Sequence, residues 1–398
     1  MISIFKNNPL FFRFWIATIA SELASRMHSL ILIWIIYKWT NSALFVGIAM
    51  VAASLPAVLI SPYAGSLIDR HNKVGIMMMA DFSRLIIVLI FSYLYYINVL
   101  DTTWLISGTV LISLASAFFN PASYAMLPTL VHKEEITQAN AIGQISGSAS
   151  SVVGPLFGSA LIATLGVSKA FMGAGVLFLI SVLFLYNIKD LSYVANKISS
   201  PILEDIKHGF KLVKQYAIVH KMMLKMAVVN FFFSALTIIV PIMAKSDVKE
   251  IAYLMSAIGA GMLSGSLFLS TVKLKLKPNI TLSFSLIFIG IAFILTGFSS
   301  HIMLLILEMF VMGFMLNLFN ITLIAIYQTR LPQASLGKIM SLIIAVSLSL
   351  QPISYGIVGA AIGYVGVFKA LLISGLVILI SAIGVYHIKE LNQEEKLD

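Results

Sequence analysis

The feature that most constrains this chain is a succession of long apolar segments separated by short charged loops. Each segment holds about 20 or more residues with few charges, which is enough for an α-helix to cross the hydrocarbon core of a bilayer. Of the 398 residues, 60% are hydrophobic and only 11% are charged, whereas soluble domains average about 25% charged residues. Because the alternating pattern of a β-barrel is also absent, the sequence predicts an all-α polytopic membrane protein.

The segments predict twelve transmembrane helices, so both termini lie on the same side of the membrane. The first apolar run continues to about Tyr37, which is too long for a signal peptide, and we expect it to be retained as a helix. The predicted spans are 11–37, 43–67, 75–99, 103–127, 138–164, 168–188, 221–244, 250–270, 279–298, 302–328, 336–361 and 367–387.

Basic residues are distributed unequally between the two sides of these spans. The loops on the side of the termini hold 19 Lys and Arg residues, and those on the other side hold five. The positive-inside rule therefore predicts cytoplasmic termini. The formal charge of +10 does not indicate nucleic-acid binding, since the basic residues stand in small groups between apolar spans.

The two halves of the chain repeat at an offset of 200 residues. Gly65-Ser-Leu matches Gly265-Ser-Leu, Phe119-Asn120 matches Phe319-Asn320, and Gly166-Val-Ser-Lys-Ala matches Gly366-Val-Phe-Lys-Ala. A duplicated six-helix unit explains these matches, with a substrate expected between the halves near the bilayer midplane. We therefore predict two pseudo-symmetric six-helix bundles, residues 1–188 and 221–398. The linker 189–220 carries an amphipathic helix that is either bound to the membrane surface or a passive connection.

The loop between the second and third spans reads Gly65-x-x-x-Asp69-Arg70-x-x-Lys73, which resembles the most specific motif of the major facilitator superfamily. The resemblance covers the whole chain and is closest to the branch that contains macrolide-efflux proteins and the enterobactin exporter. The further motifs that carry it are Asp81-x-x-Arg84, Asn120-Pro121-Ala122, Leu127-Pro128-x-x-Val131, Ala139-Asn140-Ala141 and Gly154-Pro155-x-x-Gly158, although Ala149 departs from the antiporter pattern.

The resemblance implies a monomeric secondary transporter of the bacterial cytoplasmic (inner) membrane. Its partners would be protons, the lipid bilayer and a small amphipathic substrate such as a drug, macrolide or siderophore, exported by alternating access. Import of a nutrient with protons or sodium stays an alternative. We expect no cofactor, no metal and no enzymatic activity, because the sequence has no cysteine, no H-E-x-x-H pattern, no clustered histidines and no P-loop.

Two pairs of charged residues are candidates for gating. Asp69 and Arg70, with Gly65 and Lys73, are placed to bridge helix ends and lock one state of the transporter. Asp81 and Arg84 lie nearer the cytoplasmic end than the bilayer centre, and we assign them to the same gating network. For Asp69 and Arg70, an ordinary solvated turn is the alternative.

Ionisable and polar residues inside the spans are the candidates for proton coupling and substrate binding. Glu22 lies about 15 Å into the first span, one turn before Arg26, and the pair either couples protons or only stabilises the helix. Glu308 has no charged neighbour within a helical turn. The uncharged candidates are Asn120, Asn320 and Gln351.

Two further features concern the shape of the protein. Gly154, Pro155 and Gly158 in the fifth span permit close helix contact and bending, which fits either a hinge or static packing. The 26 Phe, 19 Met and 14 Tyr residues suit an adaptable apolar pocket. Since most of them face lipid or other helices, they favour a hydrophobic substrate only weakly.

Overall fold

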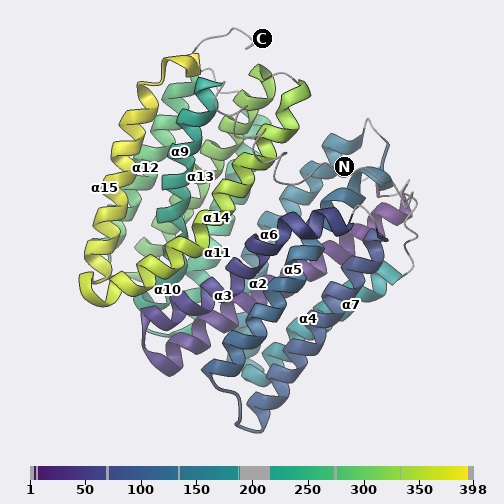
Figure 1. The fold of residues 1–398 in the computed structure, drawn as a ribbon. Coiled ribbons are helices and arrows are strands. Elements are labelled where there is room, and N and C mark those ends of the chain that lie inside the picture. Colours follow the sequence, from purple (N-terminus) through teal and green to yellow (C-terminus); the bar gives the residue numbers. More distant parts are fainter. Residues whose placement is uncertain are drawn as a thin grey trace. The chain divides into compact units, whose positions relative to one another are not determined.

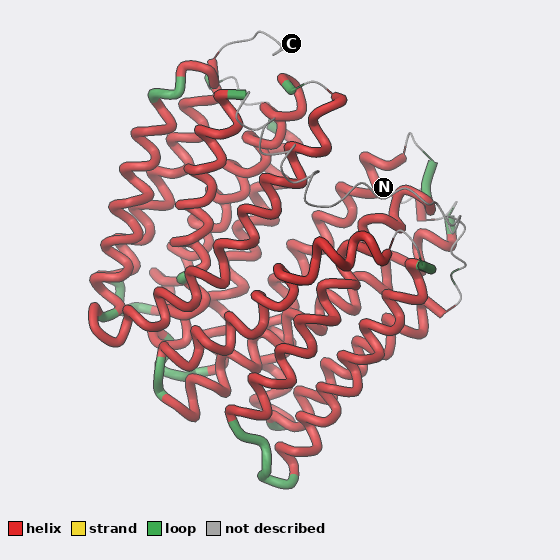
Figure 2. Tube along the Cα trace, viewed as in Figure 1, coloured by secondary structure: helices red, strands yellow, loops and turns green. Residues whose placement is uncertain are grey.

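The structure is a computed structural model that describes residues 4–5, 8–68, 71–132, 135–186, 188, 216–272, 276–331 and 333–392. These residues form helices joined by short loops and contain no strand (Figure 2). The helices are α2 (Pro9–Thr40), α3 (Ala43–Ile68), α4 (Lys73–Tyr96), α5 (Thr102–Leu130), α6 (Ile136–Leu165), α7 (Val167–Tyr186), α9 (Ala217–Ser234), α10 (Leu236–Met243), α11 (Val248–Thr271), α12 (Pro278–Phe298), α13 (Ile302–Arg330), α14 (Gln333–Val365), α15 (Val367–Tyr386) and the short 3₁₀ helix η2 (Lys389–Asn392).

The predicted polytopic helical fold is confirmed. Within the described residues, eleven helical segments are long and apolar enough to cross a membrane. The long helix α14, which spans Gln333–Val365, covers the remaining predicted span.

Polar residues set the ends of several helices. The Asn8 side chain accepts a hydrogen bond from the Phe11 amide at 2.9 Å, and Pro9 follows it as the first residue of α2. The helix ends at Asn41, whose φ of 47° is left-handed, a conformation that Asn adopts more readily than most residues. These signals fix where α2 begins and ends.

The seventh predicted span, 221–244, is one continuous apolar run, but the structure breaks it into α9 and α10 at Ala235. The carbonyl of Phe231 accepts hydrogen bonds from the hydroxyls of Ser234, at 2.9 Å, and Ser354, at 2.5 Å. Side chains that bond to a helix carbonyl compete with the helical ladder at that position. Pro241, within α10, also lacks an amide hydrogen.

Backbone contacts divide the chain into two compact units. Unit 1 holds α2, most of α3, α4 to α7 and the start of α11, and unit 2 holds α9, α10, the rest of α11 and α12 to α15. In unit 1, α2 packs on α6 and α7, and α4 packs on α5 and α7 (Figure 1). In unit 2, α12 packs on α13 and α15, and α9 packs on α14 and α15.

The sequence repeat has a counterpart in local geometry. Gly166 separates α6 from α7 with a φ of 85°, and Gly366 separates α14 from α15 with a φ of 80°. Both glycine amides donate to a carbonyl four residues earlier, at 3.1 and 2.9 Å. Because a positive φ is unfavourable for residues with a Cβ, both turns require glycine.

The predicted linker, 189–220, lies outside the described residues up to position 215. Its amphipathic helix and the limits of the two predicted bundles stay predictions.

Candidate functional site

The predicted gating loop joins α3 to α4. The Asn72 side chain caps α4 by accepting a hydrogen bond from the Gly75 amide at 2.7 Å, so Lys73 is the first residue of that helix. At Gly65, near the end of α3, an added Cβ would meet no atom within 4 Å. Asp69 and Arg70 lie outside the described residues, and their gating role stays a prediction.

Asp81 and Arg84 form a buried ion pair inside unit 1. The Arg84 Nη1 to Asp81 Oδ1 distance is 2.8 Å, and the two side chains are 2% and 0% exposed. The Ser21 hydroxyl of α2 donates to the same Asp81 oxygen at 2.9 Å and accepts from Arg84 at 3.2 Å. The pair therefore ties α4 to α2 through a hydrogen-bonded cluster, as a buried charge requires.

Aromatic rings complete the surroundings of the Arg84 guanidinium. The Phe119 ring centre lies 5.0 Å from it, and that of Phe178 lies 5.7 Å away. These distances are within the range of cation–π attraction.

Glu22 and Arg26 lie on the inner face of α2, where the carboxylate and guanidinium are 4.0 Å apart. Their side chains are 38% and 50% exposed, so neither is buried in the core. The Glu22 carboxylate also lies against α6, because a Cβ placed on Gly147 would be 3.2 Å from its Oε1. This loose pair contrasts with the tight, buried pair of Asp81 and Arg84.

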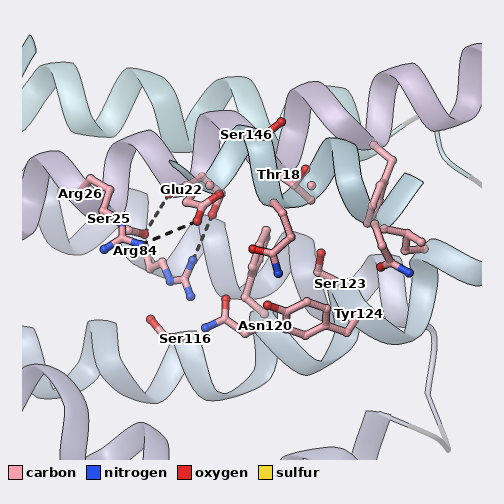
Figure 3. Close-up of a pocket in the computed structure, with 18 of the residues that line it drawn as sticks. Thr18, Glu22, Ser25, Arg26, Arg84, Ser116, Asn120, Ser123, Tyr124 and Ser146 are labelled. Carbon is pink, nitrogen blue, oxygen red and sulfur yellow. Dashed lines mark hydrogen bonds and ion pairs between the residues drawn. The ribbon is translucent and has the colours of Figure 1, made fainter. Parts of the chain in front are cut away.

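A cavity of about 400 Å³ joins these charged groups inside unit 1 (Figure 3). It is lined from α2 by Phe14, Thr18, Ser21, Glu22, Ser25, Arg26 and Ser29, from α4 by Arg84, from α5 by Ser116, Phe119, Asn120, Ser123, Tyr124 and Leu127, and from α6 by Asn140, Gly143, Gln144, Ser146 and Gly147. Its size falls within the usual range of small-molecule sites.

The cavity brings together three predicted candidates, Glu22, Arg26 and Asn120. It also includes Arg84, which the sequence assigned to the gating network near the end of the span. The position of Arg84 along its helix predicts its depth in the membrane. It does not predict the direction of the long side chain, which reaches across to Ser21 on α2.

The other predicted binding residues do not line this cavity. Asn320 in α13 and Gln351 in α14 are half-buried residues of unit 2. Glu308 in α13 accepts a hydrogen bond from the Ser299 hydroxyl at 2.5 Å, while its second oxygen is buried without a partner among the described residues. Glu308 has no charged neighbour within a helical turn of the sequence, and its hydrogen-bond partner in the structure is the uncharged hydroxyl of Ser299.

The predicted packing motif of α6 lies against α2. A Cβ on Gly154 would be 2.5 Å from the Arg26 Cβ, and one on Gly158 would be 3.1 Å from the Met27 Cγ. Pro155 lies between them inside the helix. Both glycines permit close approach of the two helices, and a hinge at this point stays a prediction.

Sequence reasoning missed most of the polar lining on α5 and α6. Tyr124 lies one turn after Asn120, and Gln144 lies one turn after Asn140. Polar pairs four residues apart in an apolar helix share one face. This spacing was the signal that could have located them.

Comparison with known proteins decides the family. The model of the family described as transmembrane secretion effector, within the major facilitator superfamily, matches residues 5–398. The chain belongs to this family. It is therefore a multi-pass membrane transporter with a small-molecule substrate, and not an enzyme.

Several relatives of this transporter have names that refer to efflux. Macrolide efflux protein A of Streptococcus pyogenes is 23% identical, with 96% of each chain covered. The multidrug efflux pump Tap of Mycolicibacterium fortuitum is 22% identical and covers 91% of this chain and 92% of its own. The enterobactin exporter EntS of Escherichia coli O1:K1 / APEC is 24% identical, with coverage of 60% and 58%. The predicted branch of the superfamily is thereby confirmed.

Solved structures of other transporters share the fold. The crystal structure of a bacterial homologue of the iron transporter ferroportin superposes with a TM-score of 0.74 and 13% identity. The similarity covers 95% of this chain and 99% of that one. At this identity, the likeness concerns the fold alone.

Proposed function

We propose that this transporter exports small amphipathic compounds in exchange for protons, by alternating access. It acts as a monomer in the bacterial cytoplasmic membrane with both termini in the cytoplasm. The efflux-type names of its relatives support the direction of transport, and the excess of basic residues on one side supports the orientation.

The observation that carries the proposal is the position of Glu22. This carboxylate lines a polar cavity at mid-depth of a membrane helix, and its 38% exposure lets water and protons reach it. Membrane carboxylates that face a cavity commonly serve as proton or ligand sites. Asp81, by comparison, is fully buried and bonded to Arg84 and Ser21.

Protonation of Glu22 changes its interaction with Arg26. At 4.0 Å the two opposite charges attract each other. When Glu22 takes a proton, that attraction is lost and the carboxylate loses part of its capacity to accept hydrogen bonds. A proton and a ligand hydroxyl that donates to ionised Glu22 thus compete for the same carboxylate, which is the coupling that an exchanger needs.

Transport into everted membrane vesicles tests the proposal. Vesicles energised by respiration are given labelled macrolide, cationic dye or siderophore, with and without a protonophore. We expect accumulation of at least one compound that the protonophore and the Glu22→Gln variant both abolish. Glu250→Gln, which changes a carboxylate in the first turn of α11, is the matched control.

Accumulation that survives both the protonophore and Glu22→Gln would contradict the proposal. If Glu308→Gln abolishes it while Glu22→Gln does not, the coupling site lies in α13 instead.

A further inference from the structure

We infer that the cavity of unit 1 binds an uncharged, hydroxyl-rich group such as a sugar or polyol, and not a lipophilic cation. This inference rests on the proposed function, in which the cavity receives the transported compound. It names the chemical class of ligand that the residues lining this cavity, the wall of the site, recognise.

The lining is dominated by neutral hydrogen-bonding side chains. Eleven of the 19 lining residues carry a neutral hydroxyl or amide, and three are charged. Phe14, Phe119 and Leu127 are the large apolar members. Most ligand pockets for drug-like molecules are instead lined predominantly by apolar and aromatic side chains.

Several of these polar groups have unused hydrogen-bonding capacity. On α5, Asn120, Ser123 and Tyr124 make no side-chain hydrogen bond to the described residues, and on α6 the same holds for Asn140 and Gln144. In Figure 3, Asn120, Ser123 and Tyr124 lie on one helix beside the cavity. These side chains of α5 and α6 are therefore available to form hydrogen bonds with a ligand.

Hydroxyl groups match this arrangement. A side-chain amide offers both donors and acceptors, and so does a hydroxyl, so each can pair with a ligand hydroxyl in either direction. An apolar ligand would displace water from these groups without replacing its hydrogen bonds. Each group left unpaired in this way weakens binding by roughly five-fold or more.

The charges in the wall are already balanced. Glu22 faces Arg26 at 4.0 Å, and Arg84 is bonded to Asp81 at 2.8 Å. The wall therefore has no excess charge to attract an ion. Tyr124, a residue that is 75% exposed, provides the flat surface of its ring for the apolar face of a sugar ring.

Binding of matched compounds to the full transporter in lipid nanodiscs tests the inference, since sugar-based detergents would compete. The probes are phenyl glucoside and phenyl maltoside, the deoxygenated analogue phenoxytetrahydropyran, and tetraphenylphosphonium, measured by saturation-transfer NMR. We expect both glycosides to bind more tightly than the other two compounds.

Variants of the lining make the test specific. In Asn120→Leu/Gln144→Leu, the affinity for the glycosides should fall about ten-fold or more, the effect of losing one or two hydrogen bonds. The affinity for phenoxytetrahydropyran should stay the same or rise. Thr164→Val changes a hydroxyl near the end of the same helix as Gln144, outside the cavity, and should alter neither affinity.

Three results would overturn the inference: no binding of either glycoside, equal or tighter binding of tetraphenylphosphonium, or an unchanged preference in the double variant. Failure of the proposed function is a separate result. If glycosides bind as expected but no compound shows proton-dependent accumulation in vesicles, the ligand class stands and the proton coupling falls. If tetraphenylphosphonium accumulates and glycosides do not bind, the coupling stands and the ligand class falls.

Discussion

The buried pair of Asp81 and Arg84 makes a quantitative prediction about stability. Both side chains are almost completely inaccessible to solvent, and they share a 2.8 Å hydrogen bond and the Ser21 hydroxyl. Removing one member leaves a buried charge without its counterion, which typically costs about 3–5 kcal/mol. We therefore expect Asp81→Asn and Arg84→Met each to destabilise the transporter by about that amount.

A double variant distinguishes the cost of an uncompensated buried charge from the cost of lost packing. Asp81→Asn/Arg84→Met removes both charges, so no buried charge is left uncompensated, and the amide introduced in place of the carboxylate can still bond to Ser21. Replacing both partners of a buried pair with groups of similar size is often close to neutral. The double variant should thus be more stable than either single variant.

Unfolding in mixed detergent micelles, with increasing sodium dodecyl sulfate and tryptophan fluorescence as the signal, measures these differences. A double-mutant cycle should give a coupling free energy of more than about 3 kcal/mol, because the two single substitutions together cost about 6–10 kcal/mol and the double variant should cost less than either one. If either single variant is as stable as the wild type, or if the effects of the two substitutions simply add, the pair does not have the role described here.

Three other perturbations have defined outcomes. The ring nitrogens of His28 are buried without partners among the described residues, so His28→Leu should raise the free energy of unfolding by about 1 kcal/mol; an equal or lower free energy of unfolding in this variant would contradict that reasoning. Gly154→Ala places a Cβ 2.5 Å from a neighbouring side-chain carbon and should lower the melting temperature, while Gly143→Ala, with no atom within 4 Å, should not; equal effects would contradict the close packing. The hydrogen bond from Lys221 lowers the pKa of Glu390 below its usual 4.5. The contact therefore stabilises the fold above pH 4.5, and this stabilisation is lost as the pH falls through the lowered pKa of Glu390. Limited proteolysis of the C-terminus should show that pH dependence in the wild type and not in Glu390→Gln.

Much of the helical architecture could be predicted from the sequence. In a bilayer, backbone groups must bond within the segment, so an uncharged run of sufficient length has few options besides a helix. The break at Ala235 could not be predicted, because the Ser354 hydroxyl that contacts the Phe231 carbonyl comes from 123 positions later in the chain.

The candidate site was only partly predictable for a similar reason. The spacing of Glu22 and Arg26 placed both on one helix face, and that pairing is present. Which helices surround them depends on tertiary packing, so the contributions of Tyr124 and Gln144 were missed. The buried side chain of Arg84 lines the cavity from α4, and nothing in the local pattern indicates its direction.

Proton flux through purified transporter is the most direct test of the central claim that Glu22 couples protons to transport. Proteoliposomes with an internal pH dye receive an exported compound in the absence of an imposed gradient. We expect substrate-dependent proton movement in the wild type, its loss in Glu22→Gln, and retained substrate exchange in that variant, because the binding cavity is intact. Proton movement of equal size in Glu22→Gln would contradict the account.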